Sequence, residues 1–561
     1  MSKDKLNILI GGEAGQGLVT VGYILTKTAI RAGYSVHVTQ SYQSRIRGGH
    51  NTCAIRIGVD GVAAPQETVD LLIALDADTV NLHRNEVLPD GCIVASSEFK
   101  NADDPRARKV PYKDLAPERQ LNIVALGIAA ETLGLDEELV ARTTEDYFGK
   151  KHKEVEETRN ALRKAFDWSR QNAVQTFQRV QKPETQRKRL TMCGNEALAL
   201  GAIAAGVKFA AFYPMTPSTS VNLALISHAH KMGIVVEQAE DEIAAVNMAI
   251  GASYAGAPSM VATSGGGFAL MVEGVSLAGM TETPLVIVLG QRPAPATGLP
   301  TRTEQSDLEF VLHAGHGEFP RAVFAPGTVE ECFHLAHKAF DIAERSQGPV
   351  FILTDQHLAD SYRAVEPFPV NDLAPVRPGA DPNSVPTPYK RYAITDSGVS
   401  PRRLPGVSKH LVVVDSDEHT EDGHLTEDLA VRKQMVEKRL RKMDIIRREV
   451  IPPAYDGPES PEILFVSWGS TKGAVREAAL QLRTGGKHVA TMHFSQVWPI
   501  ITEHYVHRLQ KAKQVVCIEG NATGQFARLI RRETGFNIEK SVRRYDGLPM
   551  TAESILRDLR L

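Results

Sequence analysis

Residues 209–263 read FAAFYPMTPSTSVNLALISHAHKMGIVVEQAEDEIAAVNMAIGASYAGAPSMVAT. Short apolar runs alternate here with segments of helical spacing. We expect three strands and two helices, at Phe209–Tyr213, Ile234–Gln238, Met260–Thr263, Ser218–Met232 and Glu242–Tyr254. Regular alternation of strand and helix is typical of a mostly parallel sheet with helices on both faces. The segment therefore predicts an α/β fold.

The alternation extends through most of the chain, so the 561 residues are expected to form a multidomain α/β protein. We expect five parts: an N-terminal domain (1–179), a polar, basic linker (180–192), a central domain (193–357), an extended charged connecting region (358–460) and a smaller C-terminal α/β domain (461–561). One charged helix is expected at about Thr426–Val450. The connecting region either wraps over other parts or a partner, or is a flexible insertion.

Composition excludes several classes of protein. The net charge of -3 gives no electrostatic footprint for nucleic acid or an anionic membrane. No apolar stretch is long enough to span a bilayer, and the N-terminus does not resemble a secretory signal, so we expect a cytoplasmic protein. The five cysteines are scattered without a ligand cluster, which predicts small buried side chains and no iron–sulfur cluster on this chain.

A glycine-rich loop, Gly11–Gly17, joins the first expected strand to a helix. Free N–H groups and the helix dipole favour a phosphate there, so Gly12, Gly15 and Gly17 are candidate contacts. A nicotinamide site is excluded, because the glycine spacing differs from the dinucleotide fingerprint and the second strand has no acidic residue at its end. A tight turn without a ligand is the alternative.

A second loop, Ser44–His50, has Arg47 next to Gly48. Arginine can hold phosphate bidentately where glycine lets the backbone approach. The alternative is that the arginines of this loop are ordinary surface residues.

Two hydroxyl residues, Thr216 and Ser218, follow the expected strand Phe209–Tyr213. Ligands of open parallel sheets bind at the carboxyl ends of strands, so both hydroxyls are placed for a substrate. The alternative is that Ser218 or Thr219 only caps the following helix.

Charged residues add further candidates. Glu240, Asp241 and Glu242 stand at a strand-to-helix junction, where all three either serve a site or favour the helix N-terminus. Arg302, in a loop framed by proline and glycine, either binds an anionic substrate or is a surface residue. The acidic segment Asp415–Asp428 either binds a cation or is solvated, and we assign no metal ligands on this chain.

Several motifs carry a family resemblance. YPMTPST at Tyr213–Thr219 resembles the YPITPSS motif of 2-oxoacid:ferredoxin oxidoreductases. Other segments are similar to the remaining signatures of that family: Gln238–Ala245, Thr263–Gly267, Gly298–Gln305 and, for its gamma subunit, GEAGQG and Arg47-Gly48-Gly49. The resemblance covers essentially the whole chain in the order gamma then alpha. Met215 and Thr219 depart from the motif, with little expected effect on the backbone.

The resemblance implies a gamma-type domain on the coenzyme A side (1–179), a pyrimidine-side thiamine diphosphate domain (193–357) and a transketolase C-terminal-like domain (461–561). A beta partner would carry the diphosphate, Mg²⁺ and a [4Fe-4S] cluster, and the present sequence has no GDG motif for Mg²⁺–diphosphate. The resemblance also implies that activity needs that partner and a ferredoxin, within a dimer of heterodimers.

Roles of individual residues also follow from the resemblance. Glu242 would be the catalytic carboxylate at the pyrimidine ring, where burial favours sharing a proton. Thr216 and Arg302, with Ser218, would bind the 2-oxoacid.

Coenzyme A would be contacted by glycines of the first loop and by the arginine loop: Gly12, Gly15, Gly17, Arg47 and Gly48.

The implied reaction is oxidative decarboxylation of a 2-oxoacid to an acyl-CoA, CO₂ and reduced ferredoxin, possible in reverse as CO₂ fixation. We expect 2-oxoglutarate and succinyl-CoA, with pyruvate or a branched-chain 2-oxoacid as the alternative. A second class of function is also open, in which the chain is a non-catalytic scaffold protein of the same fold that binds coenzyme A. A self-contained thiamine decarboxylase is excluded by the missing diphosphate domain.

Overall fold

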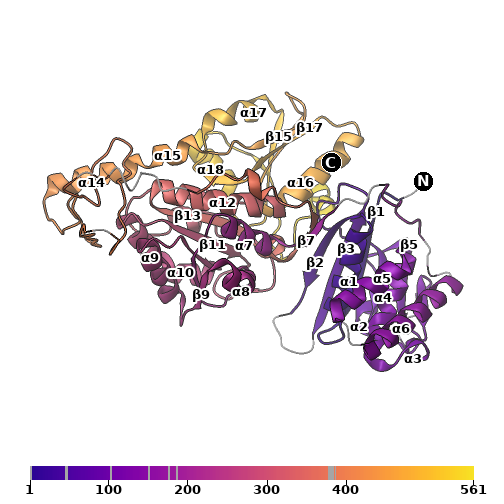
Figure 1. Cartoon of the computed structure of the whole chain (residues 1–561). Coiled ribbons are helices and arrows are strands. Elements are labelled where there is room, and N and C mark those ends of the chain that lie inside the picture. Colours follow the sequence, from indigo (N-terminus) through magenta and orange to yellow (C-terminus); the bar gives the residue numbers. More distant parts are fainter. Residues whose placement is uncertain are drawn as a thin grey trace. The chain divides into compact units, whose positions relative to one another are not determined.

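The structure is a computed structural model (Figure 1). It describes residues 3–43, 49–100, 104–149, 152–172, 174, 177–184, 188–376, 385, 387–407 and 409–560. The chain forms two compact units. Unit 1 comprises Met1–Cys193, Asp360–Phe368 and Thr551–Arg557, and unit 2 comprises the remainder.

Unit 1 contains an eight-stranded sheet of order β6-β5-β4-β1-β3-β2-β14-β7. Its strands are β1 (Lys5–Glu13), β2 (Ser35–Ser41), β3 (His50–Gly58), β4 (Val69–Ala74), β5 (Val87–Ser96), β6 (Ala107–Val110), β7 (Leu190–Met192) and β14 (Tyr362–Val365). In one half of the sheet, the neighbouring strands β6, β5, β4 and β1 are parallel. In the other half, β3, β2, β14 and β7 pair antiparallel with their neighbours. β2 ends at Ser41 and β3 begins at His50, a separation too short for the crossover that parallel pairing needs.

Helices cover both faces of this sheet. They are α1 (Leu18–Arg31), α2 (Ala77–His83), α3 (Tyr112–Leu115), α4 (Leu121–Thr132), α5 (Glu137–Phe148) and α6 (His152–Gln171). One core joins the sheet to Val21 of α1, Leu126 of α4 and Phe166 of α6. A smaller core on the other face contains Val80 of α2. The expected helices on both faces are therefore present.

Two strands of unit 1 come from segments where we expected none. β7 lies in the segment 180–192 that was expected to be a linker, and β14 lies in the region expected to connect the later domains. β14 pairs with both β2 and β7, so these short segments extend the sheet. Their backbone groups gain hydrogen-bond partners only from strands distant in sequence, which local pattern does not reveal.

Unit 2 contains a seven-stranded sheet of order β18-β12-β13-β11-β10-β8-β9. Its strands are β8 (Phe209–Phe212), β9 (Val235–Gln238), β10 (Ser259–Thr263), β11 (Leu285–Gln291), β12 (Ala322–Phe324), β13 (Pro349–Asp355) and β18 (Gln496–Trp498). All neighbours are parallel except β18, which is antiparallel to β12. Three inner strands, β10, β11 and β13, are buried at every position, as a sheet covered on both faces requires.

The helices around this sheet are α7 (Gly194–Ala204), α8 (Thr219–Met232), α9 (Glu242–Tyr254), α10 (Gly265–Met280), α11 (Leu308–His313), α12 (Val329–Ser346) and α13 (Gln356–Asp360). α9 has the bounds that the sequence predicts. It begins where it does because Asp241 accepts a hydrogen bond from the Ala244 N–H, 2.8 Å away. The α/β fold expected for this part of the chain is confirmed.

A second sheet of unit 2 has the order β15-β17-β16-β19-β20. Its strands are β15 (Ala454–Asp456), β16 (Ile463–Trp468), β17 (Val489–Phe494), β19 (Gln514–Glu519) and β20 (Lys540–Arg543), and its helices are α16 (Lys472–Thr484), α17 (Val506–Lys511) and α18 (Gln525–Thr534). Most of the last helix, α19 (Ala552–Leu559), belongs to unit 1. All pairs are parallel except that of β15 with β17. The edge strands β15 and β20 were not predicted, because they are short and polar.

The charged helix expected at Thr426–Val450 is divided into α14 (Leu429–Arg441) and α15 (Met443–Arg448). α14 is fixed by a buried ion cluster. Lys438 Nζ lies 2.6 Å from Glu282 Oε1, and Lys442 Nζ lies 2.9 Å from Glu282 Oε2. All three side chains are almost fully buried. This part of the connecting region is therefore packed against the segment that follows α10.

All five cysteines are buried, as expected, and none of them forms a disulfide. Within the described ranges no helix is long and apolar enough to cross a membrane. The same residues contain no group of three or more His, Cys, Asp or Glu side chains suited to a metal ion. In the segment Asp415–Asp428, Glu418 instead pairs with Arg439 at 2.8 Å.

Candidate active site

The candidate site lies at one edge of the seven-stranded sheet. Strands β8, β9, β10 and β11 are parallel, so their carboxyl ends meet at the same edge. The segments that follow them carry Thr216, Glu242, Gly267 and Arg292. The edge therefore brings together three motifs that are far apart in sequence.

The three acidic residues before α9 differ in their surroundings. Glu240 is exposed, Asp241 is the helix cap, and Glu242 is only 3% exposed. The buried Glu242 Oε1 has no hydrogen-bond partner among the described residues. A buried carboxylate oxygen without a partner costs free energy unless a ligand group or a proton satisfies it. Of the three, Glu242 has the environment that suits a catalytic carboxylate.

Gly267 explains how Glu242 is accommodated. A Cβ on Gly267 would lie 2.5 Å from Glu242 Oε1 and 2.2 Å from Thr263 Oγ1. Glycine is therefore required where α10 passes over the carboxylate. The backbone of the Thr263–Gly267 motif keeps space beside the Glu242 oxygen.

A second buried carboxylate lies beside this motif. Asp307 Oδ2 would be 2.7 Å from a Cβ on Gly265, and it has no hydrogen-bond partner within the described part of the chain. The Asp307 N–H donates to Gln291 Oε1 at 3.0 Å. Burial, with a contribution from nearby Glu304, raises the pKa of Asp307 to about 6, while Arg292 opposes the shift. Asp307 can thus change its protonation state near neutral pH.

This shift predicts the effect of Asp307→Asn. The folded protein binds a proton at Asp307 below about pH 6, whereas the unfolded chain does so only near pH 3.8, so this group makes stability rise as pH falls between these values. The neutral variant should lose that pH dependence and be more stable at pH 8, by up to about 3 kcal/mol. Urea unfolding at about pH 4.5 and at pH 8 measures both effects. Equal pH dependence in variant and parent would contradict the assignment.

Thr216 and Ser218 lie in the turn between β8 and α8. Arg292 Nη1 donates to the Thr216 carbonyl oxygen at 2.6 Å, which fixes the turn. Ser218 is 2% exposed, and its hydroxyl donates to the Met215 carbonyl oxygen at 3.0 Å. The Ser218 side chain makes no helix-capping bond. In this structure Ser218 stabilises the turn, and Thr216 is the more accessible of the two hydroxyl residues.

Arg302 is half-buried in a loop held by the C-terminal part of unit 2. The Thr303 N–H donates to the Gly547 carbonyl oxygen at 3.2 Å, and a Cβ on Gly547 would lie 3.1 Å from Arg302 Cβ. Gln305 Oε1 accepts from the Gly520 N–H at 2.7 Å. The second sheet of unit 2 thus determines where the Arg302 loop lies.

The glycine-rich loop lies in unit 1 and is shorter than expected. β1 continues through Glu13, and Gly12 pairs in register with Asn51 of β3. Only the turn that follows is a loop, in which Gly15 (φ 102°) and Gly17 (φ 78°) adopt left-handed backbone angles. No atom of the described residues lies within 4 Å of a Cβ on Gly15, so this position is open to a ligand. Arg47 and Gly48 lie outside the described residues.

Comparison with known proteins shows to which family the chain belongs. Over 619 aligned residues the chain is 30% identical to a 2-oxoacid:ferredoxin oxidoreductase subunit alpha of Sulfolobus sp, which covers 98% of this chain and 96% of that subunit. The chain belongs to the 2-oxoacid:ferredoxin oxidoreductase family. The family resemblance and the enzyme class inferred from sequence, a thiamine diphosphate-dependent oxidoreductase subunit, are thereby confirmed.

Further comparisons support the same family assignment for this oxidoreductase chain. Residues 200–438 match the family described as "Pyruvate flavodoxin/ferredoxin oxidoreductase, thiamine diP-bdg", and residues 7–168 match "Pyruvate ferredoxin/flavodoxin oxidoreductase". The 2-oxoglutarate synthase subunit KorA of Archaeoglobus fulgidus is 32% identical over 60% of this chain and 90% of its own.

A solved structure, 2-oxoglutarate:ferredoxin oxidoreductase from Magnetococcus marinus with 2-oxoglutarate, coenzyme A and succinyl-CoA bound, covers 100% of this chain and 99% of its own. It has a TM-score of 0.93 and 32% identity.

Sequence reasoning missed Arg292, Asp307 and the steric role of Gly267. Asp307 lies just beyond the Gly298–Gln305 motif, and Arg292 directly follows β11. The position of Arg292 at the end of β11 was an available signal, whereas Asp307 directly precedes α11 and follows no strand. Their mutual proximity depends on the sheet and could not be read from spacing.

Proposed function

We propose that this oxidoreductase chain is a fused gamma and alpha subunit that acts on 2-oxoglutarate, with coenzyme A, to give succinyl-CoA, CO₂ and reduced ferredoxin. The observation that carries the proposal is the buried Glu242 carboxylate, whose Oε1 has no partner among described residues and faces the glycine motif Thr263–Gly267. The preference for 2-oxoglutarate is supported by the relatives whose names specify that substrate. Pyruvate and branched-chain 2-oxoacids are the alternatives.

The residues at the sheet edge fit the pyrimidine side of thiamine diphosphate. Glu242 offers an unsatisfied oxygen to a ring nitrogen, and Gly267 leaves room beside it. Thiamine diphosphate supplies the carbanion chemistry that decarboxylation requires. Glu242 holds or accepts a proton at Oε1, while Thr216 and Arg302 orient the 2-oxoacid through its carboxylate. Asp307 has no role in these steps.

The remaining requirements of the reaction are assigned to other molecules. A beta subunit would hold the diphosphate, Mg²⁺ and a [4Fe-4S] cluster, and ferredoxin would accept the electrons. The turn that contains Gly15 and Gly17, which is open at Gly15, would contact coenzyme A in unit 1, together with Gly12, Arg47 and Gly48. Two heterodimers, each of this chain and one beta subunit, would form the complete enzyme.

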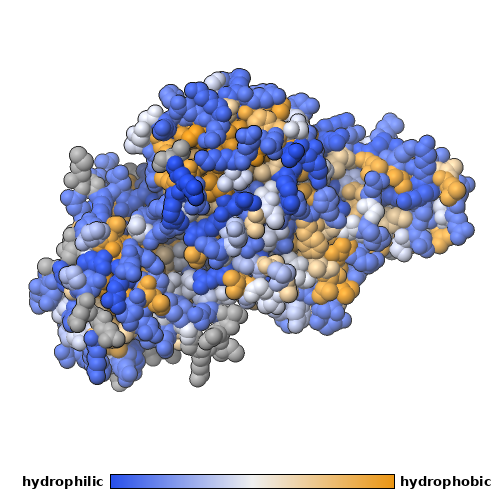
Figure 2. All heavy atoms as spheres, turned by 180° about the vertical axis from the view of Figure 1, so that it is seen from behind, coloured by the Kyte–Doolittle hydropathy of each residue, from blue (hydrophilic) through white to orange (hydrophobic). Residues whose placement is uncertain are grey.

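A hydrophobic surface near the candidate site suits the beta subunit. The exposed apolar residues lie on α8, edge strand β9, α9 and α10: Leu223, Ile226, Val235, Ile243, Met248 and Leu270. Hydrophobic residues are visible at the surface in the area of α9 and α10 when the molecule is seen from behind (Figure 2). Large exposed apolar patches mark interaction sites. β9 also leaves one strand edge of the seven-stranded sheet unpaired.

Arg302→Leu tests the substrate role. Loss of a charged hydrogen-bond donor to a carboxylate should raise the KM for the 2-oxoacid about 10- to 100-fold, while the KM for coenzyme A stays unchanged. Viologen reduction by the complex with its partner measures both constants. Arg528→Leu, at an exposed arginine of α18, is the control.

The parent complex should prefer 2-oxoglutarate to pyruvate and 2-oxoisovalerate by at least about 100-fold in kcat/KM. A preference for pyruvate would overturn only the choice of substrate. An unchanged KM in Arg302→Leu would overturn the role of Arg302.

A further inference from the structure

The first turn of α10, Gly265-Gly266-Gly267, lies between two buried carboxylates. A Cβ on Gly267 would lie 2.5 Å from Glu242 Oε1, and a Cβ on Gly265 would lie 2.7 Å from Asp307 Oδ2. Glu242 is 3% exposed, and Asp307 is 7% exposed. Asp307 therefore borders the same glycine motif as the proposed catalytic carboxylate.

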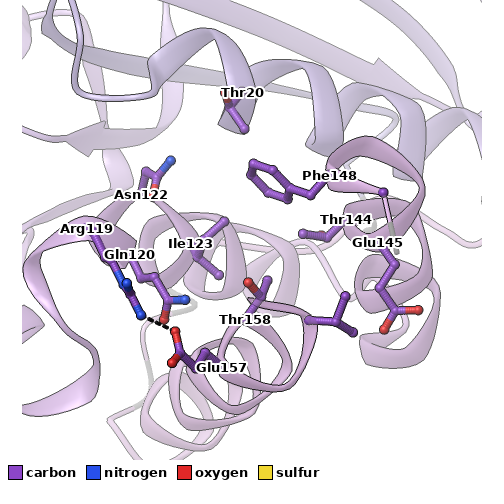
Figure 3. A pocket seen from close by; sticks show the side chains of 12 residues that line it. Thr20, Arg119, Gln120, Asn122, Ile123, Thr144, Glu145, Phe148, Glu157 and Thr158 are labelled. Atoms are coloured by element: carbon purple, nitrogen blue, oxygen red, sulfur yellow. Dashed lines mark hydrogen bonds and ion pairs between the residues drawn. The ribbon is translucent and has the colours of Figure 1, made fainter. Parts of the chain in front are cut away.

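These two carboxylates differ from the others in the part of the chain that the structure describes. Glu242 Oε1 and Asp307 Oδ2 are its only buried carboxylate oxygens without a hydrogen-bond partner. By contrast, the buried Glu282 pairs with two lysines. Glu157, which lines a cavity in unit 1, pairs with Arg119 (Figure 3). An unsatisfied buried oxygen costs free energy, so two of them at one turn indicate a function and not a packing requirement.

A hydroxyl residue connects the two sides of this turn. Ser264 stands in the chain between Gly265, which contacts Asp307, and Thr263, whose Oγ1 would lie 2.2 Å from a Cβ on Gly267. Ser264 is fully buried, and its Oγ has no partner among the described residues and does not cap α10. A hydroxyl group can donate and accept a hydrogen bond at the same time. Ser264 can thus pass a proton from one side of the turn to the other.

The surroundings of Asp307 suit proton exchange. Asp307 directly precedes α11, but its side chain makes no capping hydrogen bond and is free for another use. The charged groups that face it are Glu304 and Arg292. Burial and, to a smaller extent, Glu304 raise the pKa of Asp307 to about 6, and Arg292 opposes the shift. Groups that exchange protons work best when their pKa lies near the working pH.

We propose that Asp307 supports the candidate active site by exchanging protons with Glu242 through the hydroxyl of Ser264. The proposal rests on the role that the proposed function gives to Glu242. When Glu242 Oε1 gives a proton to Ser264 Oγ, the hydroxyl proton of Ser264 passes to Asp307 Oδ2. One carboxyl group loses a proton and the other gains it, and the reverse transfer restores Glu242.

Infrared difference spectra between the parent and Asp307→Asn test the titration without thiamine diphosphate, in the complex with the beta subunit. A protonated carboxyl band should appear as pH falls through about 6. Glu304→Gln should move this titration to lower pH, because the Glu304 charge raises the pKa of Asp307. Glu309→Gln, at an exposed carboxylate that pairs with Arg528, should leave the titration in place. A carboxyl group that stays ionised down to about pH 4 would overturn the proposal.

Proton exchange at C2 of thiamine diphosphate tests the transfer itself. In D₂O, the loaded complex should exchange this proton at least about 10-fold more slowly in Asp307→Asn and in Ser264→Ala, as NMR after an acid quench measures. Asp307→Ala leaves space for a small acid, so added formate should restore part of its exchange rate. A loss that formate does not reverse would assign Asp307 a packing role only and would overturn the proposal.

Glu242→Gln separates this inference from the proposed function. If Glu242→Gln slows C2 exchange while Asp307→Asn and Ser264→Ala exchange like the parent, only the transfer through Ser264 is overturned. If Glu242→Gln itself exchanges like the parent, the proposed function fails and the transfer fails with it.

Discussion

Glu242→Gln should reduce 2-oxoacid-dependent viologen reduction by the complex about 100-fold or more. Glutamine keeps the shape of the side chain but cannot hold or accept a proton at Oε1, and acid–base groups contribute about 10²–10⁴-fold to enzymatic rates. Glu242 is 3% exposed, and its Oε1 has no partner among the described residues. The variant should therefore fold normally and lose only turnover.

Glu240→Gln is the matched control, since Glu240 lies two residues away but is exposed. It should retain parental activity. Full activity in Glu242→Gln, or an equal loss in Glu240→Gln, would show that Glu242 is not the catalytic carboxylate. Circular dichroism and complex formation with the beta subunit establish that both variants fold.

Glu282→Ala should cost about 3–5 kcal/mol of the free energy of unfolding of unit 2. The substitution leaves Lys438 and Lys442 buried without their carboxylate, and Lys438 Nζ lies only 2.6 Å from Glu282 Oε1 in the parent. A buried charge that loses its partner pays the full desolvation cost. Urea unfolding followed by tryptophan fluorescence measures the loss.

Glu437→Ala provides the control, because Glu437 forms an exposed pair with Lys433 on the same α14 helix. Exposed pairs contribute at most about 1 kcal/mol. A similar small loss in Glu282→Ala would refute the importance of the buried cluster.

The cluster also predicts a pH dependence. Burial alone would raise the pKa of Glu282, but the charges of Lys438, Lys442 and Arg391 hold it well below its usual value of 4.5. A depressed carboxyl pKa contributes stability above the unfolded value, and that stability is lost as pH falls further. Unit 2 of the parent should lose stability below about pH 4.5, and Glu282→Ala should lose less over the same range.

Much of the central fold could be predicted from sequence. The bounds of α9 were expected to the residue, and Asp241 marks its start through a side-chain cap. The glycine-rich loop was expected to begin at Gly11, but β1 continues through Glu13. Glycines usually indicate a loop, yet the pairing of Gly11 and Gly12 with β3 keeps them in the strand. That pairing depends on residues about 40 positions away.

The candidate site was predicted in part. Position after a strand indicated Thr216 and the group Glu240, Asp241 and Glu242, because chemistry in α/β proteins gathers at strand ends. The choice of Glu242 and the role of Arg302 came from the family resemblance. The burial that separates Glu242 from Glu240 could not be known before the helix packed. Arg292 and Asp307 were missed, since only the parallel sheet brings them to the same edge.

The most direct test of the central claim is viologen reduction, with 2-oxoglutarate and coenzyme A, by this chain alone, by its beta partner alone and by the two together. Turnover is expected only in the mixture, and only when both substrates are present. Turnover by this chain alone, or no turnover with any 2-oxoacid in a well-formed complex, would contradict it.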